Sequence, residues 1–174
     1  MSINDFIANF KGGARPNRFR VQITWPGIVG TPNVRDEIVV SAAGLPASVI
    51  GVIPVPYKGR QIPVPGDRTF EDWTITVVND TTFSHRNAFE RWLNLINAHE
   101  ANVQGTDTYK NLLATVDVVQ LDRDDKILKT VKLFNVFPTN VAQIDLGYDQ
   151  NDVLEQYTVT FSYSHWGSGN TPTN

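Results

Sequence analysis

The chain has 174 residues, a formal net charge of −3, 41% hydrophobic and 19% charged residues, and no cysteine. This length predicts one domain that buries a sizeable core without a disulfide or metal staple, and the composition excludes a disordered chain. The charge balance argues against a strongly basic nucleic-acid binder. The lack of cysteine excludes disulfide frameworks, thiolate metal sites, iron–sulfur clusters and cysteine nucleophiles.

Charge is unevenly distributed along the chain. Residues 1–87 contain 9 Lys and Arg against 7 Asp and Glu, whereas residues 88–174 contain 6 against 11. This asymmetry can help copies of the chain meet head to tail, although ordinary surface variation is the simpler interpretation.

A short amphipathic helix is predicted at the start of the chain. Its apolar residues fall at i, i+3, i+4 and i+7: Ile3, Phe6, Ile7 and Phe10. Ser2 and Asp5 resemble a capping box, and Gly12 with Gly13 ends the pattern. A helix this short is marginal alone, so it must pack on its own domain or on a neighbouring copy. The N-terminus also lacks the pattern of a secretory signal.

The stretch from Ile38 to Tyr57 contains no charged residue. It is long enough to span a membrane, but Gly44, Pro46 and further Gly and Pro residues would break a helix there. We therefore expect no membrane partner. We expect strands instead, which are uncharged because other protein surface covers them.

Alternating and β-branched segments predict seven or eight strands. They lie at residues 18–25, 34–43, 49–57, 60–64, 71–79, 113–121, 127–137 and 156–163. Lys58-Gly59 is a plausible hairpin turn, and prolines at 54, 56, 63 and 65 make this hairpin an edge or a projecting arm, about residues 45–66. Pro138-Thr139-Asn140 is expected to end the seventh strand.

One interior helix is predicted at about residues 84–99, with an apolar stripe of Phe89, Trp92, Leu93 and Ile96. The pattern therefore favours a mainly β fold: an antiparallel β-sandwich or barrel with one flanking α-helix, a short N-terminal helix and a projecting β-hairpin arm. We expect a single domain over residues 1–166 and a flexible C-terminal tail over residues 167–174.

No pattern in the sequence indicates catalysis. The phosphate-binding, dinucleotide-binding, metalloprotease and nucleophile-elbow motifs are all missing from the chain. The histidines, His85, His99 and His165, have no ligand-like spacing and are expected at the surface or as helix caps. The acidic groups around residues 122–125 and 149–152 fail the calcium-loop spacing. We expect no enzyme, no catalytic residue, no cofactor and no metal.

A series of motifs runs through residues 45–80. The segment begins with Leu-Pro-Ala and continues with Ile-Pro-Val, Gly-Arg-x-Ile, GDRTF at 66–70 and DWT at 72–74. Ala-Arg-Pro-Asn-x-Phe at 14–19 and PTNV at 138–141 add two further matches. Together these motifs resemble the tail tube proteins of contractile-tailed bacteriophages over about residues 1–166.

The resemblance implies a protein that forms hexameric rings, which stack into the inner tube of a contractile tail and conduct DNA. It implies as partners other copies of itself, the tail sheath protein, baseplate and tail terminator proteins, a tape measure protein in the lumen, and DNA passing without sequence-specific binding. It places the protein in the virion, assembled in the host bacterial cytoplasm. An alternative is the tube of a phage-derived injection system or a type VI secretion-like machine delivering protein effectors. A weaker alternative is a monomeric β-sandwich binding module.

The resemblance also implies interface and lumen residues. The expected contacts between subunits or rings are Ile3, Phe6, Ile7, Phe10, Leu45, Pro46, Val52, Ile53, Val55, Tyr57, Arg60, Ile62, Asp67 and Arg68. Asp67 and Arg68 would lock the base of the arm by a charge pair, within the subunit or across the interface. The candidate lumen residues are polar and uncharged, because DNA must slide without binding: Thr74, Thr76, Gln156, Thr158, Thr160 and Ser162.

Overall fold

The structure is a computed structural model that describes residues 3, 5, 13–30, 37–105 and 109–169. Its strands are β1 (Phe19–Thr24), β2 (Glu37–Ile38), β3 (Val40–Ala43), β4 (Val49–Tyr57), β5 (Arg60–Thr69), β6 (Trp73–Val78), β7 (Ala114–Leu121), β8 (Ile127–Val141), β9 (Gln156–Ser162) and β10 (His165–Ser168). Helix α2 spans Ser84–Ile96, and a 3-10 turn spans Tyr109–Leu112.

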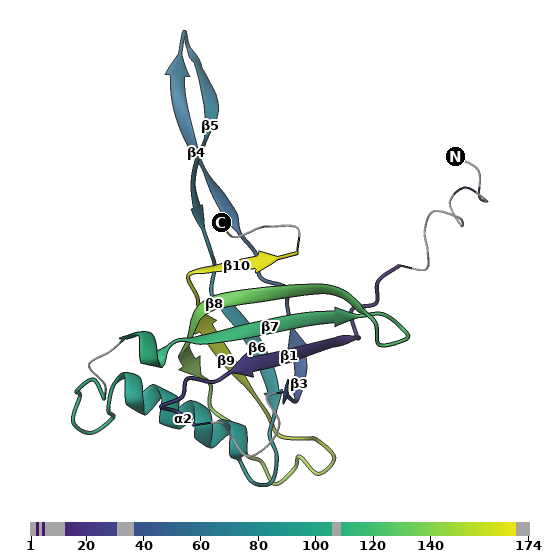
Figure 1. The fold of residues 1–174 in the computed structure, drawn as a ribbon, viewed down its shortest axis with the longest axis vertical. Coiled ribbons are helices and arrows are strands. Elements are labelled where there is room, and N and C mark those ends of the chain that lie inside the picture. The colour runs from purple at the N-terminus through teal and green to yellow at the C-terminus, as the bar shows by residue number, and fades with distance from the viewer. Residues whose placement is uncertain (1–2, 4, 6–12, 31–36, 106–108, 170–174) are drawn as a thin grey trace.

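The main sheet has the strand order β2-β1-β7-β8-β9-β6-β3, with β10 paired to β8, and neighbouring strands are antiparallel. The long strand β8 joins two halves of this arrangement. Its first part pairs with β7 and β10, and from Phe137 onward it pairs with β9. The result is a sandwich-like, mainly β body with one helix at its side (Figure 1). The predicted fold class is confirmed.

The core lies between the inward faces of the strands and helix α2. Alternation along β6 and β9 buries every second side chain, including Ile75 and Val159. Phe89 and Trp92 of α2 complete the core against aromatic rings of the sheet. The ring centroids of Trp25 and Phe89 lie 5.1 Å apart. Aromatic pairs at such distances add to the stability that comes from burial alone.

Asp80 accepts hydrogen bonds from the first residue of helix α2. Asp80 Oδ1 accepts a hydrogen bond from the Ser84 backbone N–H at 3.0 Å, and Oδ2 accepts one from the Ser84 hydroxyl at 2.9 Å. These bonds replace the intrahelical partner that a first-turn N–H lacks. The placement of His85 at the surface or as a cap is wrong, because its side chain turns into the core and is only 5% exposed.

Two predictions about strand ends are also wrong. Strand β8 does not stop at Pro138 but continues to Val141. The pairing with β9 shifts register between Pro138 and Asn140, and this irregularity lets the strand continue although proline has no N–H to donate. The expected tail from residue 167 begins too early. Gly167 and Ser168 pair with β8 opposite Lys132 and Val131, so ordered strand extends beyond the expected domain boundary.

The prediction of an N-terminal helix rests on Phe6, Ile7 and Phe10, which lie outside the described residues. Ile3 is described and its side chain is 79% exposed. Across the described ranges, none of the helices combines the length and apolar character needed to cross a bilayer.

Candidate assembly interface

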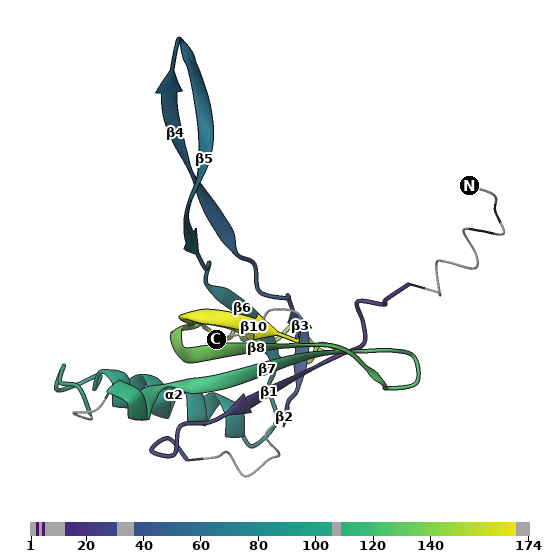
Figure 2. The same cartoon turned by 45° about the horizontal axis from the view of Figure 1, so that its top comes forward.

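Strands β4 and β5 form a two-stranded sheet of their own, which projects from the body as an arm (Figures 1 and 2). Nine residues of extended chain make β4 about 30 Å long. The turn at the tip has positive φ at both Lys58 (46°) and Gly59 (81°). Two such residues are typical of a type I′ turn, whose twist matches that of the flanking strands. The predicted projecting hairpin is therefore confirmed.

The arm exposes a large apolar surface. Most of the predicted interface residues on it are exposed: Leu45, Val52, Ile53, Val55, Tyr57, Arg60, Ile62, Asp67 and Arg68. The side chain of Val52, for example, is 67% exposed, and Pro46 at the root is half-buried. Contiguous apolar patches of this kind on a single chain mark interaction surfaces. The structure thus brings the residues from Val52 to Arg68 together on the arm, with Leu45 and Pro46 at its root.

The arm's prolines lie along its two outer edges. Tyr57 and Arg60, next to the two-residue turn, form a hydrogen-bonded pair, and bonded and non-bonded pairs alternate from there. Pro54 faces Pro63 in a non-bonded pair, and the same count places Pro56 and Pro65 in non-bonded pairs. Backbone N–H groups at such positions would point away from the hairpin. Proline removes these donors, so the edges of the arm are poor templates for pairing with another strand.

Aromatic side chains of the body hold the root of the arm. Trp73 Nε1 donates to the carbonyl of Gly44 at 2.7 Å. The Tyr163 hydroxyl and Trp166 Nε1 both donate to the carbonyl of Ala47, at 3.3 and 3.2 Å. A tyrosine hydroxyl is protonated at neutral pH and can donate, and burial raises the pKa of the Tyr163 hydroxyl further. These bonds fix where the arm leaves the body.

A bulge bends the arm just above its root. The register shifts between Ile50 and Val52, opposite Gly66. A Cβ on Gly66 would lie 3.2 Å from the carbonyl oxygen of Gly51, so glycine permits this close approach. Within the described residues, neither Asp67 nor Arg68 forms an ion pair or a side-chain hydrogen bond. Among these residues, the charge pair that was expected to lock the base of the arm is not formed.

The candidate lumen residues share one solvent-facing surface of β6 and β9, opposite the core. Thr74 lies opposite Thr160, with their hydroxyl oxygens 3.1 Å apart, and Thr76 lies opposite Thr158. Gln156 continues this surface and accepts a hydrogen bond from the Ser41 hydroxyl at 3.1 Å, and Ser162 lies at the far end of β9. The result is a polar face of neighbouring strands without formal charge.

The outer face of the other half of the sheet is charged. Arg20, Asp117 and Lys132 line a surface hollow of about 660 Å³ over β1, β7 and β8. Lys132 Nζ lies 4.0 Å from Asp117 Oδ1. The two outer faces thus differ in chemistry, since one carries cations that attract phosphate and the other carries none. In the described parts of the chain, no group of three or more His, Asp or Glu side chains is placed to hold a metal.

Sequence reasoning missed two features. The first is the pair of hydrogen bonds by which Tyr163 and Trp166 hold the root of the arm. The second is the set of exposed apolar side chains in the loop between β8 and β9, such as Leu146. For the loop, a signal was present: Leu146, Tyr148, Val153 and Leu154 interrupt a run of turn-forming residues. Such side chains in a turn-rich loop indicate an interaction surface rather than a simple connection.

Comparison with known proteins identifies a family and several sequence relatives. The sequence profile of the family "Phage tail tube protein" matches residues 14–168. The tail tube protein gp19 of Enterobacteria phage T4 is 32% identical over 169 residues, covering 95% of this chain and 99% of that protein. The tail tube protein of Serratia phage KSP90 is 30% identical over 167 residues, covering 93% of this chain and 94% of that protein.

Solved structures share the fold at low sequence identity. A chain in the baseplate of the anti-feeding prophage superposes with a TM-score of 0.65 at 15% identity, covering 90% of this chain and 95% of that chain. A chain in the sheath–tube complex of the extracellular contractile injection system PVC gives 0.63 at 12%, covering 97% of both chains. Because the family profile spans most of the sequence and the phage relatives align along nearly their whole length, the chain belongs to the phage tail tube protein family.

Proposed function

We propose that this tail tube protein forms hexameric rings that stack into the hollow inner tube of a contractile phage tail, through which DNA is delivered. The observation that carries the proposal is the apolar arm, which is exposed on both strands and forms a sheet separate from the body. A surface of this kind is stabilised only when another molecule covers it. In a self-assembling tube, neighbouring copies supply that cover.

The proposed setting is the virion. There the tube would contact the sheath around it, the baseplate and terminator at its ends, and a tape measure protein and DNA inside it, after assembly in the host bacterial cytoplasm. Structural relatives in a baseplate and in a sheath–tube complex support such neighbours. Identity of 30–33% to phage tail proteins, against 12–15% to the injection-system chains, favours the phage tail over the injection-system alternative.

The polar face of β6 and β9 is the proposed lumen wall. Binding to phosphate strengthens with each cationic contact, so a wall of Thr74, Thr76, Thr158 and their neighbours would let DNA slide. The charged face over β1, β7 and β8 would then lie against protein. Asp67 and Arg68, exposed at the base of the arm, would pair across the subunit interface.

Electron microscopy of the purified protein over a concentration series, with mass from light scattering, tests the proposal. We expect rings of about 116 kDa, six copies of the 19.4 kDa chain, or hollow stacks of such rings. Because a tube can require a nucleus, the series includes seeding with sonicated fragments of tubes from a related phage. A protein that stays monomeric at high concentration and leaves the seeds unextended would contradict the proposal.

A further inference from the structure

The tip of the arm is both aromatic and cationic. Tyr57, Lys58 and Arg60 surround the turn, and residues 38–66 contain no Asp or Glu. Lys58 Nζ lies 5.4 Å from the centroid of the Tyr57 ring, so one cation already rests on the aromatic surface. Arg60 has no carboxylate partner in the described part of the chain. The tip is therefore suited to an acidic surface with apolar contacts.

The loop of residues 142–155, between β8 and β9, has that chemistry. Leu146 is 86% exposed, and Tyr148, Val153 and Leu154 are exposed as well. Asp145, Asp149, Asp152 and Glu155 supply negative charge, and residues 133–174 contain no Lys or Arg to neutralise it. The loop therefore combines exposed apolar side chains with negative charge.

The loop also forms a receptacle. A surface hollow of about 470 Å³ is lined by Asp145, Leu146, Val153, Leu154 and neighbouring polar residues. Asp145 accepts a hydrogen bond from Gln143 at 3.0 Å, whereas the carboxylates of Asp149 and Asp152 are exposed and make no hydrogen bond or ion pair within the described residues. The hollow thus combines three apolar side chains with polar ones in its lining, and the loop that forms it carries two free carboxylates.

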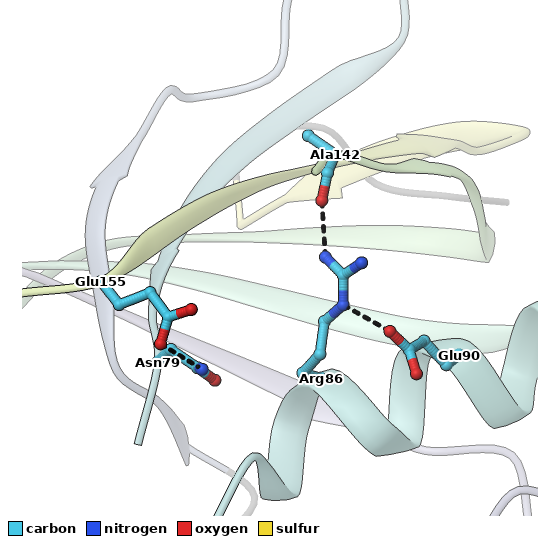
Figure 3. Close-up of polar contacts among 5 residues, drawn as sticks. All are labelled: Asn79, Arg86, Glu90, Ala142 and Glu155. Carbon is cyan, nitrogen blue, oxygen red and sulfur yellow. Dashed lines mark hydrogen bonds and ion pairs between the residues drawn. The ribbon is translucent and has the colours of Figure 1, made fainter. Parts of the chain in front are cut away.

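Both ends of the loop are fixed to the body, as Figure 3 shows. At its start, Arg86 Nη1 of helix α2 donates to the carbonyl of Ala142 at 2.5 Å, and the same guanidinium bonds Glu90. At its end, Asn79 donates to the Glu155 carboxylate at 3.0 Å. A surface whose two ends are fixed is presented with less loss of conformational entropy when it binds.

The tip and the loop lie at opposite ends of the molecule. In Figure 1, where the longest axis is vertical, the arm points to the top and the yellow-green loop between β8 and β9 lies at the bottom. A tip therefore cannot fill the hollow of its own chain. A second copy displaced along the same axis brings its loop to the tip of the first, and the contact then repeats from copy to copy.

We propose that the arm tip of one copy, residues 57–60, binds in the hollow of the β8–β9 loop of a second copy. Tyr57 packs on the exposed apolar side chains of the loop, and Lys58 and Arg60 face Asp149 and Asp152. The proposal rests on the proposed tube function and assigns the contact that joins one ring to the next. The partner is a second copy of this chain, because the two surfaces match in charge and apolar character.

Charge reversal tests the contact. We expect Lys58→Glu with Arg60→Glu, or Asp149→Lys with Asp152→Lys, to raise the protein concentration needed for tube formation by about tenfold or more, as for a lost pair of close interfacial charges. Combining all four changes restores opposite signs and is expected to recover most of the loss. The matched controls are Arg123→Glu and Asp124→Lys in the turn between β7 and β8, and they are expected to leave assembly unchanged.

Cysteine cross-linking gives a second readout that does not depend on the strength of assembly. The chain has no cysteine, so any disulfide in the double variant Arg60→Cys, Asp149→Cys joins the engineered positions. Oxidised tubes of this variant are expected to give a ladder of dimers, trimers and longer chains on a non-reducing gel. Either single variant is expected to give no ladder.

The outcomes separate this inference from the proposed function. If the unmodified protein extends no seed and forms no rings or tubes, the proposed function fails. If it forms tubes, but the reversal variants form them equally well, the combined variant shows no recovery, or the cysteine pair gives no ladder, the tip–hollow contact is wrong and the tube function stands. Circular dichroism of each variant checks that the exposed substitutions leave the fold intact.

Discussion

At the scale of single residues, two neighbours on α2 illustrate how burial decides the role of a side chain. Arg86 lies near the surface, where it bonds Ala142 and Glu90 and rests 5.1 Å over the Tyr157 ring. His85 points the other way into the core, and its Nε2 has no hydrogen-bond partner among the described residues. Burial lowers the pKa of His85, and the nearby Asp80 carboxylate opposes this shift only in part. The buried imidazole is thus kept neutral.

His85 therefore makes stability depend on pH. Well above pH 6.5, the ordinary pKa of histidine, the ring is neutral in both folded and unfolded chains. As the pH falls below that value, the unfolded chain binds a proton that the folded chain resists, so the free energy of unfolding decreases. We expect His85→Leu to reduce this loss between pH 7.5 and pH 5.5, measured by urea unfolding at both values.

The matched control is His99→Leu, because His99 is exposed beyond the end of the helix. We expect this variant to keep the pH dependence of the parent. Equal pH dependence in the parent and in His85→Leu would show that the buried ring does not titrate with folding.

At the scale of elements, the arm was the most predictable part of the fold and its surroundings were the least. Its prolines, its lack of charge and its Lys58-Gly59 turn are local signals, and they indicated the hairpin correctly. The continuation of β8 past Pro138 depends on β9 as a new partner, and β10 depends on the edge of β8. Neither partner is visible in a local pattern, so proline and glycine there predict the ends of strands.

The same limit applies to the candidate site. Alternation identified the polar sides of β6 and β9, and the pairing of Thr74 with Thr160 joins them into one face. Alternation does not identify what contacts that face, because a polar strand face is compatible with solvent or with any polar surface. The burial of His85 was likewise hidden, since a helix-terminal histidine is usually exposed or caps the helix.

The edge prolines of the arm predict an aggregation phenotype. Pro54→Val with Pro63→Val would restore two outward N–H groups on opposite edges of an apolar hairpin. Such edges pair with other strands, so we expect thioflavin-positive fibrils in place of hollow tubes or rings. Fluorescence and negative-stain images over a week at one protein concentration would measure the change.

Gln61→Val is the control for that experiment. It makes the arm more apolar and more β-branched without adding a donor, because Gln61 already has its N–H. If this control forms fibrils as readily as the proline variant, hydrophobicity rather than edge blocking governs aggregation.

At the scale of the whole molecule, folding and assembly use different surfaces. The core lies within the body, while the arm forms a separate sheet that bonds the body at its root. The chain therefore has one part that stabilises the subunit and another that remains exposed until a partner covers it. This division predicts that mutation can change assembly without changing the stability of the subunit.

Replacing residues 49–69 by a short Gly-Ser linker tests the division. Val49 pairs with Thr69, so the replaced segment begins and ends at neighbouring positions. We expect the midpoint of thermal unfolding to change by no more than about 4 °C, the effect of roughly 1 kcal/mol in a domain of this size. Rings and tubes are expected to be lost in electron micrographs.

The control keeps the arm and changes only its turn, by Lys58→Asn, which creates the Asn-Gly pair favoured in type I′ turns. Rings are expected to persist in this variant, while the loss of the Lys58 charge is expected to weaken the stacking of one ring on the next. Rings from the linker variant would show that the arm is dispensable for the lateral contacts.

The proposed lumen wall gives a last prediction. Thr158→Lys adds one cation per subunit to the polar face, and we expect purified tubes of this variant to retain DNA that unmodified tubes release, with the retention weakening as salt rises. Thr130→Lys adds the same charge on the charged outer face and is expected to retain none. The reverse result would assign the lumen to the face over β1, β7 and β8.

The arm leaves the body from one end only, and this gives any stack a direction. A contact between unlike ends has no twofold symmetry, so a stack of any length finishes in two chemically different termini. One terminus presents free basic, apolar tips, and the other presents empty acidic hollows. A single protein could not close both, and a growing tube could distinguish its first ring from its last without any further signal.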